Sequence, residues 1–285
     1  MLGVMYLEGD ELARNFDTAR TYLNQAAADN DAQSLHMLAV MHDKGLGQPV
    51  SFEEAASLYQ KAADLGYVLS QFAFAEMADT GKGVSLDKRK ALRYFRMAAD
   101  QGHKIAQFKT ALFYDIGQHI EQNYELAAQY YQMSADQGHM PAQFNLAILY
   151  DNGLGVVADF SKAASLYQKA ADQGHANAQY AFAAMLENGR GIDRSAMQAR
   201  TYYLQAAEQG HINAQVNLGV LFVKGDEFMQ DYVRAHMWFN LAAAQGNKTA
   251  RDFRDRIARR MPADDISQAQ QWARSCLQQN YRDCS

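Results

Sequence analysis

The chain of 285 residues has only 3 prolines and 2 cysteines, and it lacks long hydrophobic runs. No stretch approaches the roughly 18 consecutive apolar residues of a membrane-spanning helix, so the sequence predicts no transmembrane segment. Two cysteines in so long a chain cannot build a disulfide scaffold. The formal charge of −5 and the pI of about 5.9 give no general basic surface, so we expect no nucleic-acid partner.

What the chain does contain is a regular spacing of glycine. All 19 glycines fall into four columns of one 36-residue period. The two fullest columns are Gly66, Gly102, Gly138, Gly174, Gly210 and Gly246, and Gly9, Gly45, Gly81, Gly117, Gly153, Gly189 and Gly225. A fixed period of this size is typical of repeat proteins. It divides the chain into an incomplete repeat over 1–31, six full repeats over 32–67, 68–103, 104–139, 140–175, 176–211 and 212–247, and a tail over 248–285.

Each repeat is predicted to be a helix–loop–helix unit. In 140–175, apolar residues have helical spacing over about 142–151 and again over 160–172, with two glycines between these segments. A short polar residue precedes every second helix and can cap its first turn. These predicted N-caps are Asn15, Ser51, Asp87, Asn123, Asp159, Ser195 and Asp231. Gly66 and its equivalents, with Asn30 in the first repeat, suit the left-handed residue that follows a helix.

Small and large residues occupy separate columns of the second helices, which predicts a regular interdigitating stack. Two columns are alanine: Ala19, Ala55, Ala91, Ala127, Ala163, Ala199 and Ala235, and Ala27, Ala63, Ala99, Ala135, Ala171, Ala207 and Ala243. The adjoining column is bulky: Leu23, Tyr59, Phe95, Tyr131, Tyr167, Tyr203 and Phe239. One unit cannot bury its own apolar face, so neighbouring repeats must stack.

These repeats resemble the Sel-1-like repeat family, a relative of the tetratricopeptide repeat with a longer loop between its helices. The family pattern is Ala-x-x-x-Leu-Gly-x-x-Tyr, then Gly-x-Gly-Val, Asp-x-x-Lys-Ala, and Trp/Tyr-Tyr-x-x-Ala-Ala-x-x-Gly-His. The matching residues of one repeat are Ala142, Leu146, Ala147, Tyr150, Gly153, Gly155, Val156, Asp159, Lys162, Ala163, Tyr167, Ala170, Ala171, Gly174 and His175. The 104–139 repeat departs most, because Thr110 and His119 replace the expected leucine and glycine.

The resemblance implies an all-α fold, an α/α right-handed superhelix (solenoid) of helix–loop–helix repeats with a 36-residue period. The expected parts are seven repeats over 1–247, the first N-terminally incomplete, and a C-terminal helical cap over 248–285. The resemblance also implies an adaptor for other proteins and carries over no catalytic residues. Members of the family are often bacterial, and many are exported.

Four histidines share one column: His103, His139, His175 and His211. Packed helices lie about 8–10 Å apart, so equivalent histidines are too distant to share one zinc ion at about 2 Å. We expect them to follow the glycine cap and to help join one repeat to the next. We expect no metal and no cofactor.

One side of the first helices is a candidate binding surface, because three columns fall within about 60° of one another. The columns are His36, Phe72, Phe108, Phe144 and Tyr180; Val40, Glu76, Leu112, Ile148 and Ala184; and Asp43, Asp79, Asp115, Asp151 and Glu187. In tetratricopeptide-like stacks the first helix lines the concave face. One hypothesis is therefore a groove whose partner-binding residues are Phe72, Phe108, Phe144, Tyr180, Asp79, Asp115, Asp151 and Glu187. The alternative is that the aromatic residues pack between neighbouring first helices and the acids brace the loops.

The tail differs from the repeats in charge and in cysteine. It has a net charge of +3, which leaves −8 on the repeats. The stretch from Arg251 to Arg260 either binds an anionic partner or is the solvated surface of a cap helix. Cys276 and Cys284 are either free thiols in a reducing cytoplasm or a disulfide that pins the C-terminal end. Their spacing resembles the disulfide pairs of a cysteine-rich branch of the family, although both lie outside the repeats.

We therefore expect a non-enzymatic protein–protein interaction scaffold or adaptor that binds a protein or peptide partner on the concave face. A second hypothesis is an enzyme or a cell-wall-associated factor; it would need residues that break the repeat symmetry, and the sequence shows none. A third is a fragment of a longer exported repeat protein, because residue 1 aligns inside a first helix. Residues 1–10 show no signal peptide, so the chain as given is expected in the cytoplasm, and in the periplasm or outside the cell if its N-terminus is truncated.

Overall fold

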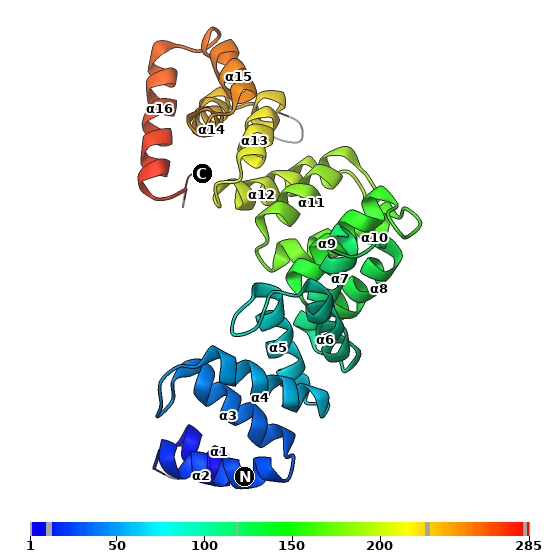
Figure 1. The fold of residues 1–285 in the computed structure, drawn as a ribbon. Coiled ribbons are helices and arrows are strands. Elements are labelled where there is room, and N and C mark those ends of the chain that lie inside the picture. The colour runs from blue at the N-terminus through cyan, green and yellow to red at the C-terminus, as the bar shows by residue number, and fades with distance from the viewer. Residues whose placement is uncertain (1, 10–12, 118, 226–228, 282–283, 285) are drawn as a thin grey trace. The chain divides into compact units, whose positions relative to one another are not determined.

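The computed structural model describes residues 2–9, 13–117, 119–225, 229–281 and 284. All regular secondary structure in these ranges is helical, and the helices follow the 36-residue period (Figure 1). The all-α solenoid class predicted from the sequence is therefore confirmed. Each helix in these ranges is too short or too polar to cross a lipid bilayer.

The helices alternate between the first and second positions of each repeat. The first helices are α1 (Leu2–Glu8), α3 (Ala32–Lys44), α5 (Val68–Thr80), α7 (Lys104–Ile116), α9 (Met140–Asn152), α11 (Ala176–Asn188) and α13 (Ile212–Lys224). The second helices are α2 (Phe16–Ala28), α4 (Phe52–Asp64), α6 (Lys88–Asp100), α8 (Tyr124–Asp136), α10 (Phe160–Asp172), α12 (Ala196–Ala207) and α14 (Tyr232–Ala244). The tail forms α15 (Lys248–Ala258) and α16 (Ala263–Gln278).

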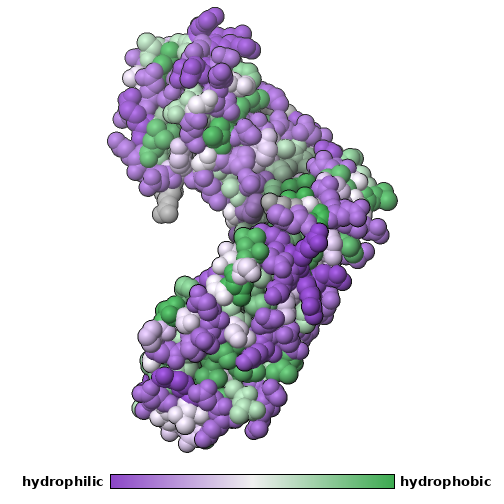
Figure 2. Space-filling view, in the orientation of Figure 1, coloured by the Kyte–Doolittle hydropathy of each residue, from purple (hydrophilic) through white to green (hydrophobic). Residues whose placement is uncertain are grey.

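The chain divides into two compact units, Met1–His139 and Met140–Ser285. Within each unit, the two helices of a repeat pack on each other, and each second helix packs on the first helix of the next repeat. In the second unit, α15 and α16 both pack on α14 and cover the last repeat. On the face drawn in Figure 2, the surface is mostly hydrophilic, with small separate hydrophobic areas.

The helix ends follow the sequence prediction closely. All seven predicted N-cap side chains accept a hydrogen bond from the backbone N–H three residues later. Asp87, for example, accepts from the N–H of Lys90 at 2.9 Å. Gly66 and its equivalents have positive φ, and Asn30 takes the same place with φ of 60°. The caps are local, so they form wherever the repeat sequence supplies them.

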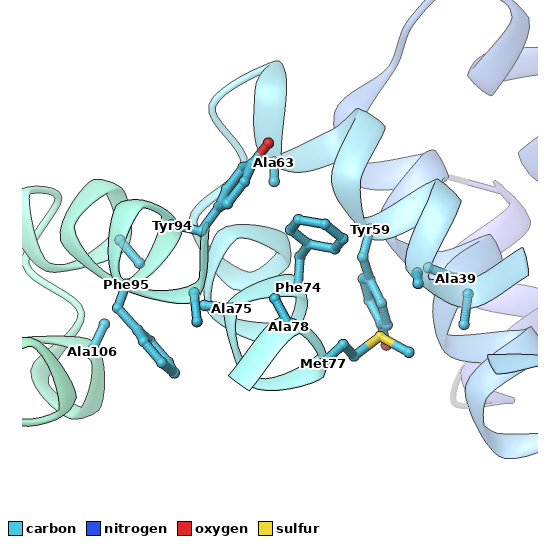
Figure 3. Close-up of a cluster of buried hydrophobic side chains, with 14 of the residues drawn as sticks. Ala39, Tyr59, Ala63, Phe74, Ala75, Met77, Ala78, Tyr94, Phe95 and Ala106 are labelled. Atoms are coloured by element: carbon cyan, nitrogen blue, oxygen red, sulfur yellow. The ribbon is translucent and has the colours of Figure 1, made fainter. Parts of the chain in front are cut away.

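Large aromatic side chains and alanines alternate in the core (Figure 3). In the first unit, Phe74 meets the ring of Tyr94 edge to face at 4.8 Å, and Ala75 and Ala78 are fully buried beside it. The small-residue columns leave space for these rings. At Gly219 in the second unit, a Cβ atom would lie 2.6 Å from Cε1 of Phe239, so the phenylalanine ring occupies the space that a side chain would need.

The two cysteines of the tail form a disulfide, which was one of the two alternatives left open by the sequence. Cys276, in α16, is bonded to Cys284, and both side chains are buried. The bond closes a short loop that holds the last described residue against α16. The interpretation of the cysteines as free thiols is therefore wrong for this structure.

Candidate functional site

The aromatic residues of the first helices occupy equivalent places in both units. Phe72 packs between Phe95, at 5.8 Å, and His103, at 4.5 Å between ring centroids. The equivalent ring triplets are Phe108 with Tyr131 and His139, Phe144 with Tyr167 and His175, and Tyr180 with Tyr203 and His211. Each of the four first-helix rings is only half-buried. Each ring therefore takes part in packing and still presents some of its surface to solvent.

Three of the four column histidines, His103, His175 and His211, act as N-caps of first helices, whereas Nδ1 of His139 has no hydrogen-bond partner among the described residues. Nδ1 of His103 accepts a hydrogen bond from the N–H of Ala106 at 3.1 Å, and the same bond joins His175 to Ala178 and His211 to Ala214. An acceptor Nδ1 requires a neutral ring with its proton on Nε2. Burial lowers the pKa of His103 and its equivalents, which favours this form. These histidines therefore cap a helix and contact the aromatic ring of the preceding repeat.

The candidate acids lie at the C-terminal ends of the first helices and contact loops or neighbouring helices. Asp79 forms an ion pair with Lys88 at 2.7 Å. Asp151 forms one at 3.1 Å with Arg190, a loop residue of the next repeat, whose guanidinium also lies over a phenylalanine ring. Asp43 and Lys82 repeat that arrangement in the first unit.

The two remaining acids accept hydrogen bonds from buried tyrosines. Oδ2 of Asp115 accepts from the hydroxyl of Tyr131 at 2.8 Å, and Oε2 of Glu187 accepts from Tyr203 at 3.0 Å. Burial raises the pKa of Tyr203; the hydrogen bond with Asn217 opposes this rise, and the contact with Glu187 adds to it. The hydroxyl therefore stays protonated and remains a donor. Glu187 also pairs with Lys224 of the next repeat at 2.8 Å. All five acids of the column thus have partners within the chain.

The eight candidate residues divide equally between the two units. Phe72, Phe108, Asp79 and Asp115 belong to the first unit, and Phe144, Tyr180, Asp151 and Glu187 belong to the second. Among the described residues, no group of three or more His, Cys, Asp or Glu side chains could hold a metal ion. The arrangement can offer aromatic and carboxylate surface, and each of these side chains also stabilises the stack.

Comparison with protein families identifies the repeats. The model of the Sel1 repeat matches residues 1–31, 32–67, 68–103, 104–139, 141–175, 176–211 and 212–247. The chain belongs to the Sel1 repeat family. The family resemblance predicted from the sequence is therefore confirmed.

Two solved structures of Sel1 repeat proteins are similar over most of the chain. One is c5321, a protective antigen present in uropathogenic Escherichia coli strains, at 28% identity and a TM-score of 0.65, with 99% of this chain and 68% of that chain covered. The other is a Sel1 repeat protein from Oxalobacter formigenes, at 26% identity and a TM-score of 0.65, with 85% of this chain and 95% of that chain covered. A comparison with curated proteins gives no match.

The Sel1 repeats also share a buried glutamine that the sequence analysis did not single out. Gln71 donates from Nε2 to the carbonyl of Ala63 in the preceding repeat at 3.2 Å, and its Oε1 accepts from Gln101 at 2.7 Å. The equivalent buried residues with the same carbonyl bond are Gln107, Gln179 and Gln215. The recurrence of glutamine every 36 residues was the signal that could have revealed this position. It was missed because an analysis of apolar periodicity assigns glutamine to the surface.

The second column of the candidate surface, Val40 and its equivalents, is partly exposed. Leu112 in the first unit and Ile148 and Ala184 in the second are half-buried, and Glu76 is exposed. Because these side chains lie one helical turn from the aromatic column, they can be changed with less effect on the ring triplets. They are the better probes of binding.

Proposed function

We propose that this Sel1 repeat protein is a non-enzymatic scaffold that binds a protein or peptide partner through the exposed side of its first helices. Sel1 repeats generally mediate protein interactions. The observation that carries the proposal is the half-exposed state of Phe72, Phe108, Phe144 and Tyr180. Aromatic side chains that are already fixed by packing lose little conformational freedom on binding, which makes them effective anchors for a partner.

The acids support a role as a polar border rather than a role in catalysis. Asp79, Asp151 and Glu187 are held by cations, and Asp115 is held by a tyrosine hydroxyl. A carboxylate that is fixed by an ion pair is suited to accept further hydrogen bonds from a partner's backbone or basic side chains at the rim of an interface.

The enzyme hypothesis remains the second candidate, and a turnover measurement separates the two. A catalytic activity that survives stringent purification, and that is lost on substitution of one of these acids without loss of folding, would support the enzyme. A partner that co-purifies in a fixed ratio would support the scaffold.

The direct experiment compares Ile148→Glu with Lys169→Glu. Ile148 lies on the candidate face of α9, whereas Lys169 is an exposed residue of the second helix α10. Both variants introduce one carboxylate into the same repeat, and both are expected to keep the helical circular dichroism signal. Partner retained on the immobilised protein, quantified by mass spectrometry, should fall about tenfold or more for Ile148→Glu and stay unchanged for Lys169→Glu. Equal retention by both variants would contradict the proposal.

A further inference from the structure

The Sel1 repeat at 104–139 departs from its neighbours at several positions, and these positions meet at one pocket of the first unit. The pocket has a volume of about 170 Å³. Its walls are formed by Asp79, Lys88, Lys109, Leu112, Phe113, Ile116 and His119. The fold therefore gathers in space residues that break the repeat symmetry; the sequence analysis singled out His119 among them but not the cluster.

At the pocket, His119 stands where four of the other repeats have glycine, namely Gly47, Gly83, Gly155 and Gly191. At Gly83 and Gly191, a Cβ atom would overlap the backbone of Phe52 and Phe160, the first residues of the preceding second helices. His119 has a Cβ atom and keeps the positive φ of the glycines, 68°, which is costly for a residue with a side chain. The corresponding first residue is Lys88 instead of phenylalanine. The loop therefore cannot close on this helix start as it does elsewhere.

The wall of the pocket is apolar and open to solvent. Phe113 is half-buried, as is Met5 of the incomplete first repeat, whereas the equivalent residues of the other five full repeats are buried: Met41, Met77, Leu149, Met185 and Leu221. Ile116 is 62% exposed, and every equivalent residue is polar: Lys44, Thr80, Asn152, Asn188 and Lys224. An exposed isoleucine at the end of α7 thus extends an apolar wall that other repeats cover.

The pocket is lined by one carboxylate, Asp79, and two lysines, so one positive charge is left over once Asp79 pairs with Lys88. The ammonium group of Lys88 is held by the carbonyl and the carboxylate of Asp79 at 2.7 Å each. Over the ranges that the structure describes, Lys109 forms no ion pair, and its equivalents are Met37, Ala73, Asn145, Ala181 and Asn217. Arg89, on the adjoining surface with Leu86 and His119, is likewise unpaired within those ranges. A cation without a partner therefore lies beside an exposed apolar wall.

We propose that this pocket binds the C-terminal residue of a protein partner. The residue's apolar side chain packs on Phe113, Leu112 and Ile116, and its terminal carboxylate accepts hydrogen bonds from Lys109 and His119. One small pocket presents both kinds of surface, so the ligand must carry a large apolar group and a carboxylate on one residue. In a polypeptide, only a C-terminal apolar residue does so. This inference rests on the proposed function, because it names the anchor of a partner bound along the first helices.

The test is a titration followed by NMR of the full chain labelled with ¹³C in its isoleucine δ1 methyl groups. The probe is N-acetyl-phenylalanine. We expect a saturable shift of the Ile116 methyl signal with N-acetyl-phenylalanine and none with its C-terminal amide. Equal shifts with acid and amide would overturn the proposal, as would equal binding of acetyl-Phe-Glu-amide, because an internal acidic segment would then suffice.

Variants taken from the chain's own repeats complete the test. Lys109→Ala with His119→Gly restores the residues of the neighbouring repeats and relieves the positive φ, so folding is expected to be kept. Affinity for N-acetyl-phenylalanine should fall about tenfold or more, because the Lys109 ammonium and the His119 ring N–H no longer donate to the carboxylate. Lys104→Ala removes the same charge from α7 outside the pocket and should bind as the unmodified protein does.

The outcomes for the pocket and for the scaffold are separable. If N-acetyl-phenylalanine does not bind, or binds Lys109→Ala with His119→Gly equally well, the pocket proposal fails. The comparison of Ile148→Glu with Lys169→Glu is unaffected by that failure, since both residues lie in the second unit. Conversely, a saturable shift of the Ile116 signal would support the pocket proposal even if Ile148→Glu and Lys169→Glu retained the same partners.

Discussion

Nε2 of Gln101 donates a hydrogen bond of 2.7 Å to Oε1 of Gln71, and it also contacts the carbonyl of Gly66 in the preceding repeat. Gln71 is 1% exposed and bonds in turn to the carbonyl of Ala63. Two amide side chains therefore connect the end of α6 to the end of α4 through the interior of the first unit. Buried amides of this kind stabilise a fold only when all their partners are present.

Gln71→Leu should destabilise the first unit by about 1–3 kcal/mol, because it removes both hydrogen bonds of a buried amide, to the carbonyl of Ala63 and from Nε2 of Gln101. The midpoint of urea unfolding, followed by circular dichroism, measures the loss. Adding Gln101→Leu should recover part of it. The 32–67 repeat has leucine at both positions, Leu35 and Leu65, and the Ala63 carbonyl keeps its bond from the N–H of Gly66. A double variant that is less stable than the single one would contradict this account.

The pair His36→Phe with Ser70→Ala should reduce the loss of stability in acid. Burial lowers the pKa of His36 to about 4, against about 6.5 in an unfolded chain. The unfolded state therefore binds more protons between these values, and stability falls as the pH drops from about 6.5 to 4, by up to about 1.4 kcal/mol per pH unit. His36 bonds to the Ser70 hydroxyl at 2.8 Å, so both residues are changed.

The replacements at 36 and 70 copy the residues at the equivalent positions of the next repeat, Phe72 and Ala106. Urea unfolding at pH 7.5 and pH 5 gives the difference in stability for each protein. His103, His175 and His211 contribute equally to both proteins, so the comparison isolates His36. An unchanged pH dependence in the variant would show that the protonation of His36 is not linked to unfolding.

Thr110→Val should stabilise the protein by about 1–2 kcal/mol. The side chain of Thr110 is fully buried, and within the described residues its hydroxyl has no hydrogen-bond partner. Valine keeps the shape and removes the desolvated hydroxyl. Thr80→Val is the matched control, because the Thr80 hydroxyl is exposed and donates to the carbonyl of Glu76 at 2.8 Å. Thermal unfolding of both variants should show a gain at position 110 and none at position 80.

Gly191→Ala should cost more stability than Gly174→Ala. Both glycines have positive φ, 70° and 91°, which costs an alanine about 1–2 kcal/mol. A Cβ atom at Gly174 would meet no described atom within 4 Å, whereas at Gly191 it would overlap the backbone of Phe160. The overlap should add about 1–3 kcal/mol. Equal urea midpoints would mean that the loop at Gly191 moves without cost.

The features that depend on a few consecutive residues could be predicted from the sequence. The N-caps at Asp87 and its equivalents and the left-handed Gly66 positions follow from local backbone chemistry. The alanine and aromatic columns predicted the stacking because the 36-residue period repeats them in register. The boundary at residue 247 between repeats and cap stays a prediction.

The candidate site was less accessible from the sequence, because it depends on which helix ends meet. The helical period placed Phe72 and Asp79 on one side of α5. It could not show that Lys88 forms an ion pair with Asp79 or that the ring of His103 stacks on Phe72. Burial of Gln71 was hidden because polarity alone suggests a surface position. The pocket beside His119 joins residues from three helices, whose convergence no single segment reveals.

The side-chain contacts between neighbouring repeats join residues that are close in sequence. His36 and Ser70 are 34 positions apart, Gln101 and Gly66 are 35, and Lys82 and Asp43 are 39. Short sequence separations give a low contact order, which favours rapid folding. They also mean that each repeat contacts only its immediate neighbours. An in-frame duplication or loss of one whole repeat would therefore preserve this pattern of contacts in the repeats that remain. Such a gene can lengthen or shorten its product one repeat at a time.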